Sequence, residues 1–439
     1  MTKHFLKILI LFFLAQIQSV CLAQGTWESV VTPTQGNLNS VYFTDSIRGW
    51  AVGDSGVIIH TSDGGVSWEL QESNTDNGIV SLFFLNNQFG WASAFNYTSP
   101  PYGTLLLKTT NGGEDWITTY YPEDNIFITT IVYFDSLTGW MGGTPHTLIH
   151  TENGGNTWQQ ANIDTSTLAF FPVLNIKFYN EQYGYASGGI FDIAGVIWRT
   201  NNGGENWYAI STDDAPADEV HGLHIFDSLN VLGSGGDPDF GYGVGMMHTL
   251  NGGVNWDYDE IGIQGIAYDV DFVNDWEGWS PLGPRRKFIY SIDAGVKWVE
   301  ISTPDSLAIF DVMFPDSLHG YAVGNDGAFL KFTPSTQVNI EELEFYRTGI
   351  NMDQNYPNPF SSVTTIKIHV PIGQKLSPKA RLNIMDITGK KLQSIIPTNI
   401  SERNYEVVFH GDGNPVGIYY YRLIDGEFST KAQRMTLIR

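Results

Sequence analysis

The sequence predicts an all-β protein, and three observations carry this prediction. The chain has 439 residues, of which 14% are aromatic and 47 are Gly. Aromatic residues favour strands, and Gly favours the tight turns that join them. Apolar residues make up 42% and charged residues 16%, a balance typical of a folded chain rather than a disordered one. The third observation is an eight-residue repeat.

The repeat Ser/Thr-x-Asp/Asn-x-Gly-x-x-Trp occurs six times. Its Trp residues are separated by 48, 42, 49, 49 and 42 positions, the spacing of four-stranded propeller blades with loops of variable length. The six copies, called boxes below, span residues 61–68, 109–116, 151–158, 200–207, 249–256 and 291–298.

Each box is expected to form the turn between the third and fourth strands of its unit. In the first unit, the strands are predicted at residues 40–44, 49–53 and 57–61, with a fourth beginning at Trp68. The Asp or Asn oxygen can accept N–H groups across the turn, while the Trp packs beneath it. We therefore expect a structural role for Asp63, Trp68, Asn111, Trp116, Asn153, Trp158, Asn202, Trp207, Asn251, Trp256, Asp293 and Trp298.

A Gly-aromatic pair ahead of each box reveals a seventh unit. The pairs are Gly49-Trp50, Gly90-Trp91, Gly139-Trp140, Gly184-Tyr185, Gly278-Trp279 and Gly320-Tyr321, with Asn230-Val231 as a degenerate member. The last unit, residues 311–332, has three strands but no box, whereas residues 25–28 look like an isolated fourth strand. A blade shared between the chain ends would close the ring and remove its open edges. The sequence thus predicts a seven-bladed β-propeller over residues 25–334, closed by shared N- and C-terminal strands.

The boxes are similar to the Asp-box, or BNR, repeats of sialidases, sortilin-type receptors and photosystem II assembly factors of the Ycf48/HCF136 kind. The strand Gly-Trp-Ala-Val-Gly at residues 49–53 most resembles the last group. The resemblance covers residues 25 to about 334 and implies a propeller fold.

The N-terminus has the layout of a secretory signal peptide over residues 1–23. Basic residues precede an apolar run at residues 8–15, and a small-residue cleavage site ends at Ala23. The run is shorter than the roughly 20 residues that a membrane span needs. Cys21 is the only cysteine, and the bulky Val20 before it disfavours lipidation. We therefore expect a mature chain with no cysteine, no disulfide and no transmembrane segment.

A second all-β module is predicted at residues 353–439, after a polar linker at residues 335–352. Alternating patterns and Gly-containing turns predict a small Ig-like β-sandwich. Its strands are expected at residues 364–370, 381–387, 404–409, 417–424 and 434–438.

Four motifs of this module, in order, resemble the type A sorting domain of the Bacteroidetes type IX secretion system. They are an opening Tyr-Pro-Asn-Pro-Phe, a central Met-Asp-Ile-Thr-Gly-Lys, a strand beginning Gly-Ile-Tyr-Tyr, and a basic C-terminus. Their key positions are Tyr356, Pro357, Asn358, Pro359, Phe360, Gly389, Gly417 and Tyr419. The resemblance implies the type IX machinery as a partner and a destination outside the cell or on its surface, reached through the periplasm.

The net charge of −24 is divided unevenly between the two parts. Residues 25–352 carry −30, whereas residues 353–439 carry +4. An acidic surface repels phosphate backbones and anionic lipid headgroups, so nucleic acid is disfavoured as a partner.

Candidate ligand-binding residues lie on loops that depart from the repeat, where propellers usually carry function. From the second-strand aromatic position to the box Ser/Thr, units 1 to 6 have spacings of 11, 18, 11, 15, 18 and 12. Units 2, 4 and 5 therefore have long loops, expected on the face opposite the boxes together with the loop that joins units 4 and 5. These loops carry Tyr97, Tyr102, Phe191, Asp192, Asp213, Asp214, Asp218, Glu219, Asp237, Asp239, Phe240 and Tyr242.

The predicted acidic sector allows two interpretations. It would suit a cation, a basic partner or a glycan. Alternatively, the carboxylates are simply solvated, or Arg285, Arg286 and Lys287 of the next unit neutralise them.

No catalytic residue, cofactor or metal site is expected. The chain lacks the Arg-Ile-Pro motif and the arginine arrangement by which sialidases hold their substrate. His60, His150 and His248 each precede a box Thr, but equivalent positions on separate blades lie too far apart to share a zinc ion.

The leading hypothesis is a monomeric, secreted or surface-displayed propeller that binds a protein or glycan without catalysis. The rival is an extracellular glycoside hydrolase that uses loop carboxylates such as Asp237 and Asp239. A third hypothesis is an assembly chaperone like the photosystem factors, although the sorting module would direct this chain outside the cell.

Overall fold

A computed structural model describes residues 25–164, 168–237, 243–334, 350–371, 375–386, 390–401, 403–425, 428–430 and 433–438. Regular structure in these ranges is almost entirely β-strand, apart from short 3-10 turns at Asp54–Gly56 (η1), Pro304–Ser306 (η2) and Asn325–Gly327 (η3). The predicted all-β class is confirmed. Within the same ranges, no helix is long and apolar enough to cross a membrane.

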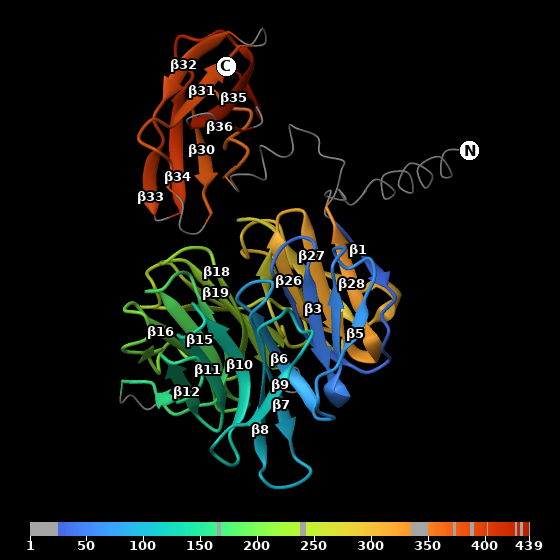
Figure 1. Ribbon diagram of the computed structural model, residues 1–439. Coiled ribbons are helices and arrows are strands. Elements are labelled where there is room, and N and C mark those ends of the chain that lie inside the picture. The colour runs from blue at the N-terminus through green and yellow to red at the C-terminus, as the bar shows by residue number, and fades with distance from the viewer. Residues whose placement is uncertain are drawn as a thin grey trace, which may run out of the picture.

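Residues 26–333 form seven antiparallel sheets of four strands each (Figure 1). Sheet 1 contains Leu38–Phe43 (β2), Gly49–Gly53 (β3), Ile58–Thr61 (β4) and Glu69–Gln71 (β5). Sheet 2 contains Gly78–Phe84 (β6), Gly90–Asn96 (β7), Gly103–Thr109 (β8) and Ile117–Tyr120 (β9). Sheet 3 contains Phe127–Tyr133 (β10), Gly139–Thr144 (β11), Thr147–Thr151 (β12) and Gln159–Gln160 (β13).

The next sheets repeat the pattern in chain order. Sheet 4 contains Val173–Phe178 (β14), Gly184–Ile190 (β15), Ala194–Thr200 (β16) and Tyr208–Ala209 (β17). Sheet 5 contains Val220–Ile225 (β18), Val231–Asp237 (β19), Gly243–Thr249 (β20) and Asp257–Glu260 (β21). Sheet 6 contains Asp271–Phe272 (β22), Gly278–Pro281 (β23), Lys287–Ser291 (β24) and Val299–Ser302 (β25).

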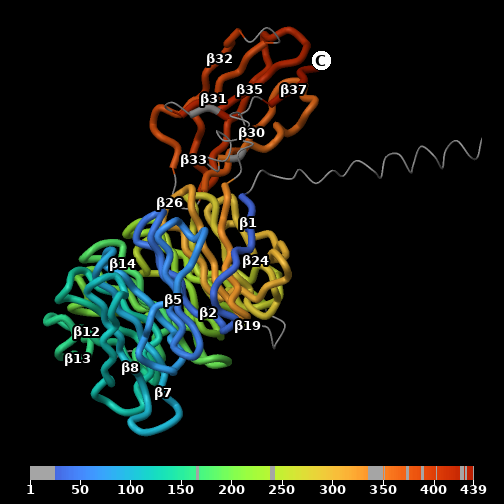
Figure 2. Tube along the Cα trace, turned by 45° about the vertical axis from the view of Figure 1, so that its right-hand side comes forward, coloured from blue at the N-terminus to red at the C-terminus, as the bar shows by residue number. Residues whose placement is uncertain are grey.

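Sheet 7 combines strands from the two ends of this region. It contains Ile309–Asp316 (β26), His319–Gly324 (β27), Phe329–Thr333 (β28) and the N-terminal strand Thr26–Val30 (β1). Strand β1 pairs antiparallel with β28, with Thr26 opposite Thr333 and Val30 opposite Phe329. Figure 2 shows the blue N-terminal strand beside the orange strands of this sheet. The first strand of each sheet contacts the first strand of the next, and β26 contacts β2, so the sheets stand around a common centre.

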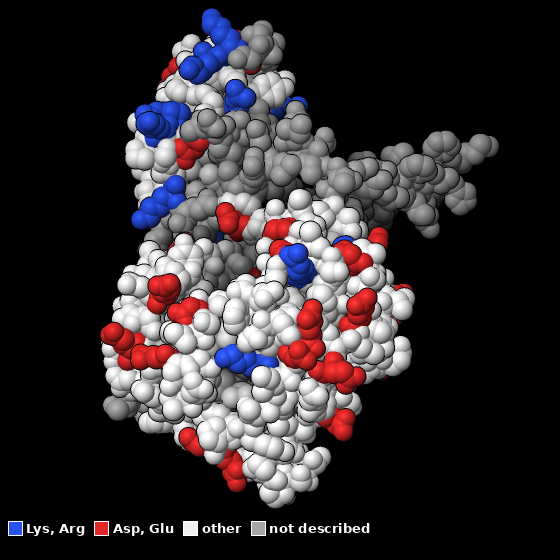
Figure 3. Space-filling view, viewed as in Figure 1, with Lys and Arg blue, Asp and Glu red and all other residues white. Residues whose placement is uncertain are grey.

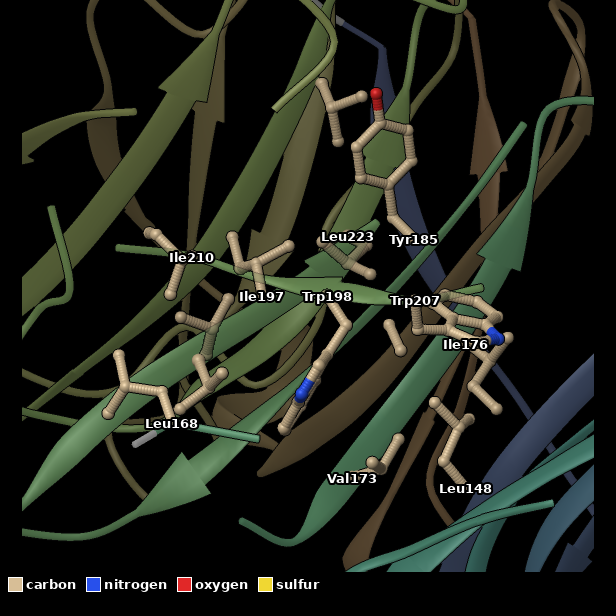
Figure 4. Close-up of a cluster of buried hydrophobic side chains, with 14 of the residues drawn as sticks. Leu148, Leu168, Val173, Ile176, Tyr185, Ile197, Trp198, Trp207, Ile210 and Leu223 are labelled. Carbon is tan, nitrogen blue, oxygen red and sulfur yellow. The ribbon is translucent and has the colours of Figure 1, made fainter. Parts of the chain in front are cut away.

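The core lies between neighbouring sheets and is rich in Trp. In the cluster of Figure 4, Trp198 and Trp207 are fully buried among aliphatic side chains such as Leu148 of β12, Val173 of β14 and Leu223 of β18. These residues come from sheets 3, 4 and 5, because each sheet buries one face against the sheet before it and the other against the sheet after it. Each box Trp therefore contributes to an interface between sheets.

The boxes are tight turns held by their own side chains. In the first box, the Thr61 hydroxyl donates to Asp63 Oδ1 at 2.8 Å and accepts the Gly65 N–H at 3.0 Å. The Ser67 hydroxyl donates to Asp63 Oδ2 at 2.6 Å and the Ser67 N–H donates to Oδ1 at 2.9 Å. These two bonds hold the pKa of the Asp63 carboxyl below its usual value, although burial opposes the shift. Gly64 and Gly65 have φ of 73° and 78°, a left-handed conformation that Gly adopts without strain.

The C-terminal module has two sheets of its own. One has the strand order Asn351–Met352 (β29), Val363–His369 (β30), Asn404–His410 (β34) and Thr398–Ser401 (β33). The other has the order Lys391–Ile395 (β32), Arg381–Met385 (β31), Gly417–Asp425 (β35) and Phe428–Ser429 (β36), with Gln433–Leu437 (β37) also paired to β35. The five expected strands are present, and β29, β32, β33 and β36 are additional.

The sorting-motif positions divide between surface and core. Tyr356 is 82% exposed, whereas Phe360 and Tyr419 are buried; Gly389 lies outside the described residues. On the face drawn in Figure 3, Lys and Arg gather on the C-terminal module, while Asp and Glu are spread over the sheets of residues 26–333.

Candidate functional site

An exposed aromatic platform stands on the long loop of sheet 2. Tyr97 is 64% exposed and stacks on Phe127 of β10, with ring centroids 4.8 Å apart. Phe95 of β7 meets both rings edge-on, at 5.9 Å from Tyr97 and 5.3 Å from Phe127. Tyr102, at the end of the same loop, is 42% exposed.

The loop beneath this platform is held by one buried amide. Asn96 is 2% exposed, and its Nδ2 donates to the carbonyls of Ser99 and Pro101 at 2.7 Å each. Its Oδ1 accepts the Thr98 N–H at 3.2 Å. The loop is therefore ordered before any ligand arrives, which lowers the entropy cost of binding.

Further exposed apolar residues lie on loops of sheets 3 and 4. Phe170 is 65% exposed and meets His146 edge-on. Ile193 is 63% exposed and follows Phe191 and Asp192 in the loop between β15 and β16. We call the residues Tyr97, Tyr102, Phe127, Phe170 and Ile193 the loop-face aromatic arc.

Three of the predicted carboxylates come together next to this arc. The Asp192 N–H donates to Asp218 Oδ1 at 3.1 Å, and one carboxylate oxygen from each of Asp192, Asp218 and Asp237 lies within 4.8 Å of the others. Asp218 and Asp237 are buried, and Asp192 is exposed. Burial, with the neighbouring charges of Asp237, Asp192 and Glu219, raises the pKa of Asp218 above its usual value. Three oxygens at this spacing can hold a metal ion, and they join loops of sheets 4 and 5.

The other predicted site residues lie apart from this group. Asp213 and Asp214 are in the loop between β17 and β18 and are not members of the three-carboxylate group. Glu219 instead contacts His221 at 3.2 Å and lines the central cavity. Asp239, Phe240 and Tyr242 lie outside the described residues. Among the described residues, no ion pair links Arg285 or Arg286 to the acidic group.

The central cavity is a feature that the sequence reasoning missed. It has a volume of about 820 Å³ and is lined by the first strands of the sheets. Its Lys, His, Asp and Glu residues are Lys177, Glu219, His221, His224, Asp269, Asp271 and Asp311. Lys177 Nζ is 3.8 Å from Asp269 Oδ1, and His224 Nδ1 is 3.0 Å from Asp271 Oδ1.

The cavity carboxylates also hold neighbouring sheets together. Asp311 Oδ2 accepts the Val41 N–H of sheet 1 at 2.8 Å, and Asp271 Oδ2 accepts the Phe314 N–H of sheet 7 at 2.7 Å. The inner edge strands would otherwise leave these N–H groups without partners. Burial and the charge of Asp269 raise the pKa of Asp311 well above its usual value, whereas the hydrogen bond from His224 lowers the pKa of Asp271 against the effect of burial.

The Asp311→Asn variant is expected to gain stability relative to wild type as the pH rises. Because the carboxyl pKa is raised in the folded state, the folded state binds the proton more tightly than the unfolded state does. The contribution of this group to stability is therefore complete at acid pH and is lost as the pH rises from the unfolded to the folded pKa value. Asn resembles the protonated carboxyl and escapes this loss, which is about 1.4 kcal/mol per unit of pKa difference. Urea unfolding at acid and neutral pH checks this, and a deficit of the variant that grows with pH would contradict it.

The box-preceding histidines have structural roles. His60 lies 4.9 Å from the Trp50 ring and stacks against it at a tilt, and His150 lies 4.8 Å from Trp140 in the same way. Burial lowers the pKa of His248 to about 4. These residues do not converge on one point, in agreement with the expected repeated strand position.

The amino-acid sequence matches a family model and is similar to several known proteins. Residues 20–122 and 102–251, together more than half of the chain, match the model described as Photosynthesis system II assembly factor YCF48. The Photosystem II assembly lipoprotein Ycf48 of Synechococcus sp. (strain CC9902) is 24% identical over 200 residues, which are 44% of this chain and 43% of that protein. The chloroplastic Photosystem II stability/assembly factor HCF136 of Oryza sativa subsp. japonica is 28% identical over 225 residues, 49% of this chain and 47% of that protein. This chain therefore spans less than half the length of each of these relatives.

Solved structures show the same fold. YCF48 bound to a D1 peptide superposes with a TM-score of 0.56 at 18% identity, over 70% of this chain and 96% of that chain. The WD40 β-propeller domain of Doa1 gives 0.52 at 14% identity, over 72% and 98%. The GH74 enzyme of Niastella koreensis gives 0.53 at 12% identity, over 94% and 75%. The fold is thus a β-propeller, and because the family model matches more than half of its length, this chain belongs to the Photosynthesis system II assembly factor YCF48 family.

Proposed function

We propose that this chain is a non-catalytic propeller that binds a protein segment on its loop face. In this proposal, the seven sheets are the blades of one ring, which β1 closes by completing the seventh blade. The bound segment lies along the loop-face aromatic arc and reaches the carboxylates of Asp192, Asp218 and Asp237.

The observation that carries the proposal is the stacked, preordered platform of Tyr97, Phe127 and Phe95. Rigid aromatic side chains supply contact area at little entropy cost, and they are frequent at binding hot spots. The adjacent carboxylates favour a segment that carries basic residues as well as apolar ones. The solved relative bound to a D1 peptide supports a protein as the ligand here rather than a glycan.

The geometry gives the hydrolase hypothesis less support. Glycoside hydrolases hold their two carboxyl groups about 5–5.5 Å apart when they retain configuration, and about 6.5–9.5 Å apart when they invert it. The oxygens of Asp192, Asp218 and Asp237 lie within 4.8 Å of one another, and Asp218 and Asp237 are buried. This spacing suits chelation or mutual hydrogen bonding better than acid and base attack on a sugar.

The C-terminal module would determine where this binding takes place. We propose a signal peptide at residues 1–23, the propeller at 25–334, a linker at 335–352 and a type IX sorting domain of Ig-like sandwich fold at 353–439. The protein would then act in secreted form or at the cell surface. Motif order, the separate core of this module and its basic charge support the assignment.

The double variant Tyr97→Ser/Tyr102→Ser is expected to retain less than about a tenth of the wild-type capacity to capture proteins from the culture medium, since aromatic hot spots contribute about 2 kcal/mol or more. The melting temperature should not change, because both rings are exposed. The matched control is Tyr120→Ser, which removes a ring that is 53% exposed on the outer strand β9. Equal capture by the double variant and the control, quantified by mass spectrometry of eluted proteins, would rule out the arc as the binding surface.

A further inference from the structure

A small pocket lies between sheets 2 and 3, beside the third box. It has a volume of about 70 Å³, which is room for about two water molecules or one small polar group. Its wall includes Trp91 of β7, Lys108 of β8, Thr119 of β9, Tyr133 of β10 and Trp158 of the box. None of the five residues of the loop-face aromatic arc lines it.

Two indole N–H groups and one ammonium group belong to the wall of this pocket. Trp91 is 5% exposed, and the buried Nε1 atoms of Trp91 and Trp158 donate to no partner among the described residues. Lys108 Nζ donates to the Gly154 carbonyl at 3.2 Å and lies 5.6 Å from the centre of the Trp91 ring. Within the described part of the chain it forms no ion pair, although residues 25–352 carry a charge of −30.

The preceding interface, between sheets 1 and 2, shows which chemical group fits the equivalent place. There the side-chain amide of Gln71, on β5, lies against the second box. Trp116 Nε1 donates to Gln71 Oε1 at 3.4 Å, and Trp50 Nε1 donates to the Gly112 carbonyl at 3.1 Å. Both indoles of that interface therefore have an oxygen acceptor.

Thr119 replaces this amide at the interface between sheets 2 and 3. Thr119 and Gln71 are counterparts, because each stands three residues after the Trp of its own box. Threonine is shorter and carries no amide, so the space that Gln71 fills stays open here and Trp158 Nε1 loses the acceptor that Trp116 has. An unpartnered box indole also occurs at Trp207, so the nitrogen alone does not identify a site.

Lys108 adds a positive charge at the same place. It pairs with Trp91 across the strands as His60 pairs with Trp50 in sheet 1. Its ammonium group takes the Gly154 carbonyl, the counterpart of the one to which Trp50 donates, and this leaves the Trp91 nitrogen without a partner. The pocket thus combines an ammonium group and two N–H donors, where the preceding interface holds a neutral amide oxygen.

We propose that the pocket beside the third box binds a carboxylate group. One carboxylate oxygen accepts the Trp158 N–H, as Gln71 Oε1 accepts that of Trp116, and the Lys108 ammonium compensates the negative charge. The carboxylate belongs either to a small free organic acid or to an aspartate or glutamate side chain of a protein. Lysine and tryptophan side chains supply donors and no acceptor, so a cation is not a suitable ligand.

NMR of the indole N–H groups tests the proposal on the purified protein. Tryptophan is labelled with nitrogen-15, and the signals are assigned from the variants Trp91→Phe and Trp158→Phe. The probes are sodium acetate and Nα-acetyl-aspartate methylamide, titrated at constant ionic strength, and acetamide is the neutral control. We expect a saturable shift of the Trp158 signal with both carboxylates and none with acetamide. Tighter binding of acetate assigns the site to a free acid, and tighter binding of the aspartate compound to a side chain.

Two substitutions test the charge and the shape of the pocket separately. Lys108→Met removes the ammonium group and should weaken acetate binding about tenfold or more. Thr119→Gln supplies the amide found at the preceding interface, so it should fill the pocket, abolish acetate binding and leave the melting temperature no lower than that of wild type. The matched control is Tyr120→Gln, whose side chain lies on the other face of β9 and which should bind acetate as wild type does.

The proposal is overturned if acetate leaves the Trp158 signal unshifted, or if acetamide or sodium chloride shifts it equally. It is also overturned if Lys108→Met or Thr119→Gln binds acetate as tightly as wild type does. If Trp158→Phe does not fold, Thr119→Gln identifies the same signal, because its amide gives the Trp158 nitrogen an acceptor.

Discussion

Replacing Trp27 by alanine is expected to lower the free energy of unfolding of the propeller by about 3–5 kcal/mol. The Trp27 ring stacks on Phe288 at 5.1 Å and meets Trp279, Phe314 and Phe332 edge-on. It is thus the anchor of β1, the strand that joins the N-terminus to sheet 7. Loss of the ring leaves a cavity among four aromatic side chains and loosens β1 from β28.

Urea unfolding followed by far-ultraviolet circular dichroism measures this effect. The matched control is Val31→Ala, directly after β1, where the side chain is 91% exposed and the change should stay within about 0.5 kcal/mol. Deletion of β1 should do more, since β28 becomes an open edge and the protein should aggregate. A Trp27→Ala variant as stable as the control would show that β1 does not hold the ring together.

Removal of residues 353–439 is expected to leave the propeller folded but trapped in the periplasm. The module has its own core, whose buried residues all lie between Ile350 and Leu437, and among the strands that the structure describes its sheets share none with sheets 1 to 7. Deletion should therefore leave the melting temperature of the propeller unchanged while its amount in the medium falls to background. Full-length protein supplies the reference for both measurements.

A single substitution tests whether export requires the module to be folded and not only present. Tyr421 is fully buried, and its hydroxyl donates to the Asp353 carbonyl and accepts the Asn355 N–H, at 3.0 and 2.9 Å. Tyr421→Ala should block release as the deletion does, whereas Tyr420→Ala, at a neighbouring exposed position, should not. Undiminished propeller in the medium after deletion would defeat the sorting assignment.

The sequence predicted strand positions accurately wherever they belong to the repeat. Box spacing located the strands of sheet 1 within about two residues, because a Gly-rich turn held by Thr61 and Asp63 requires that local pattern. Loop length identified the sector in which Asp192, Asp218 and Asp237 meet. Loop length did not reveal which carboxylates converge. Only the structure showed that Glu219 lies apart from the three that do.

The central cavity was missed for a physical reason. Lys177, His224 and Asp271 lie at partly buried positions on the first strands of their sheets. In a short strand, the sequence alone does not distinguish a charged residue that faces a cavity from one that faces solvent. The signal was available, since Lys177, Asp269, Asp271 and Asp311 stand at two positions of the repeat where units 1 to 3 have neutral residues. Phe127 was missed because it belongs to a strand rather than a loop. In the module, β32 was missed because its exposed residues show no alternation.

Hydrogen exchange of the protein with and without a captured partner tests the loop-face binding claim most directly. The account predicts slower exchange at backbone amides of residues 97–102, 191–193 and 210–219, with unchanged exchange at the box turn of residues 63–67. Protection confined to the box turns or to residues 353–439 would contradict it.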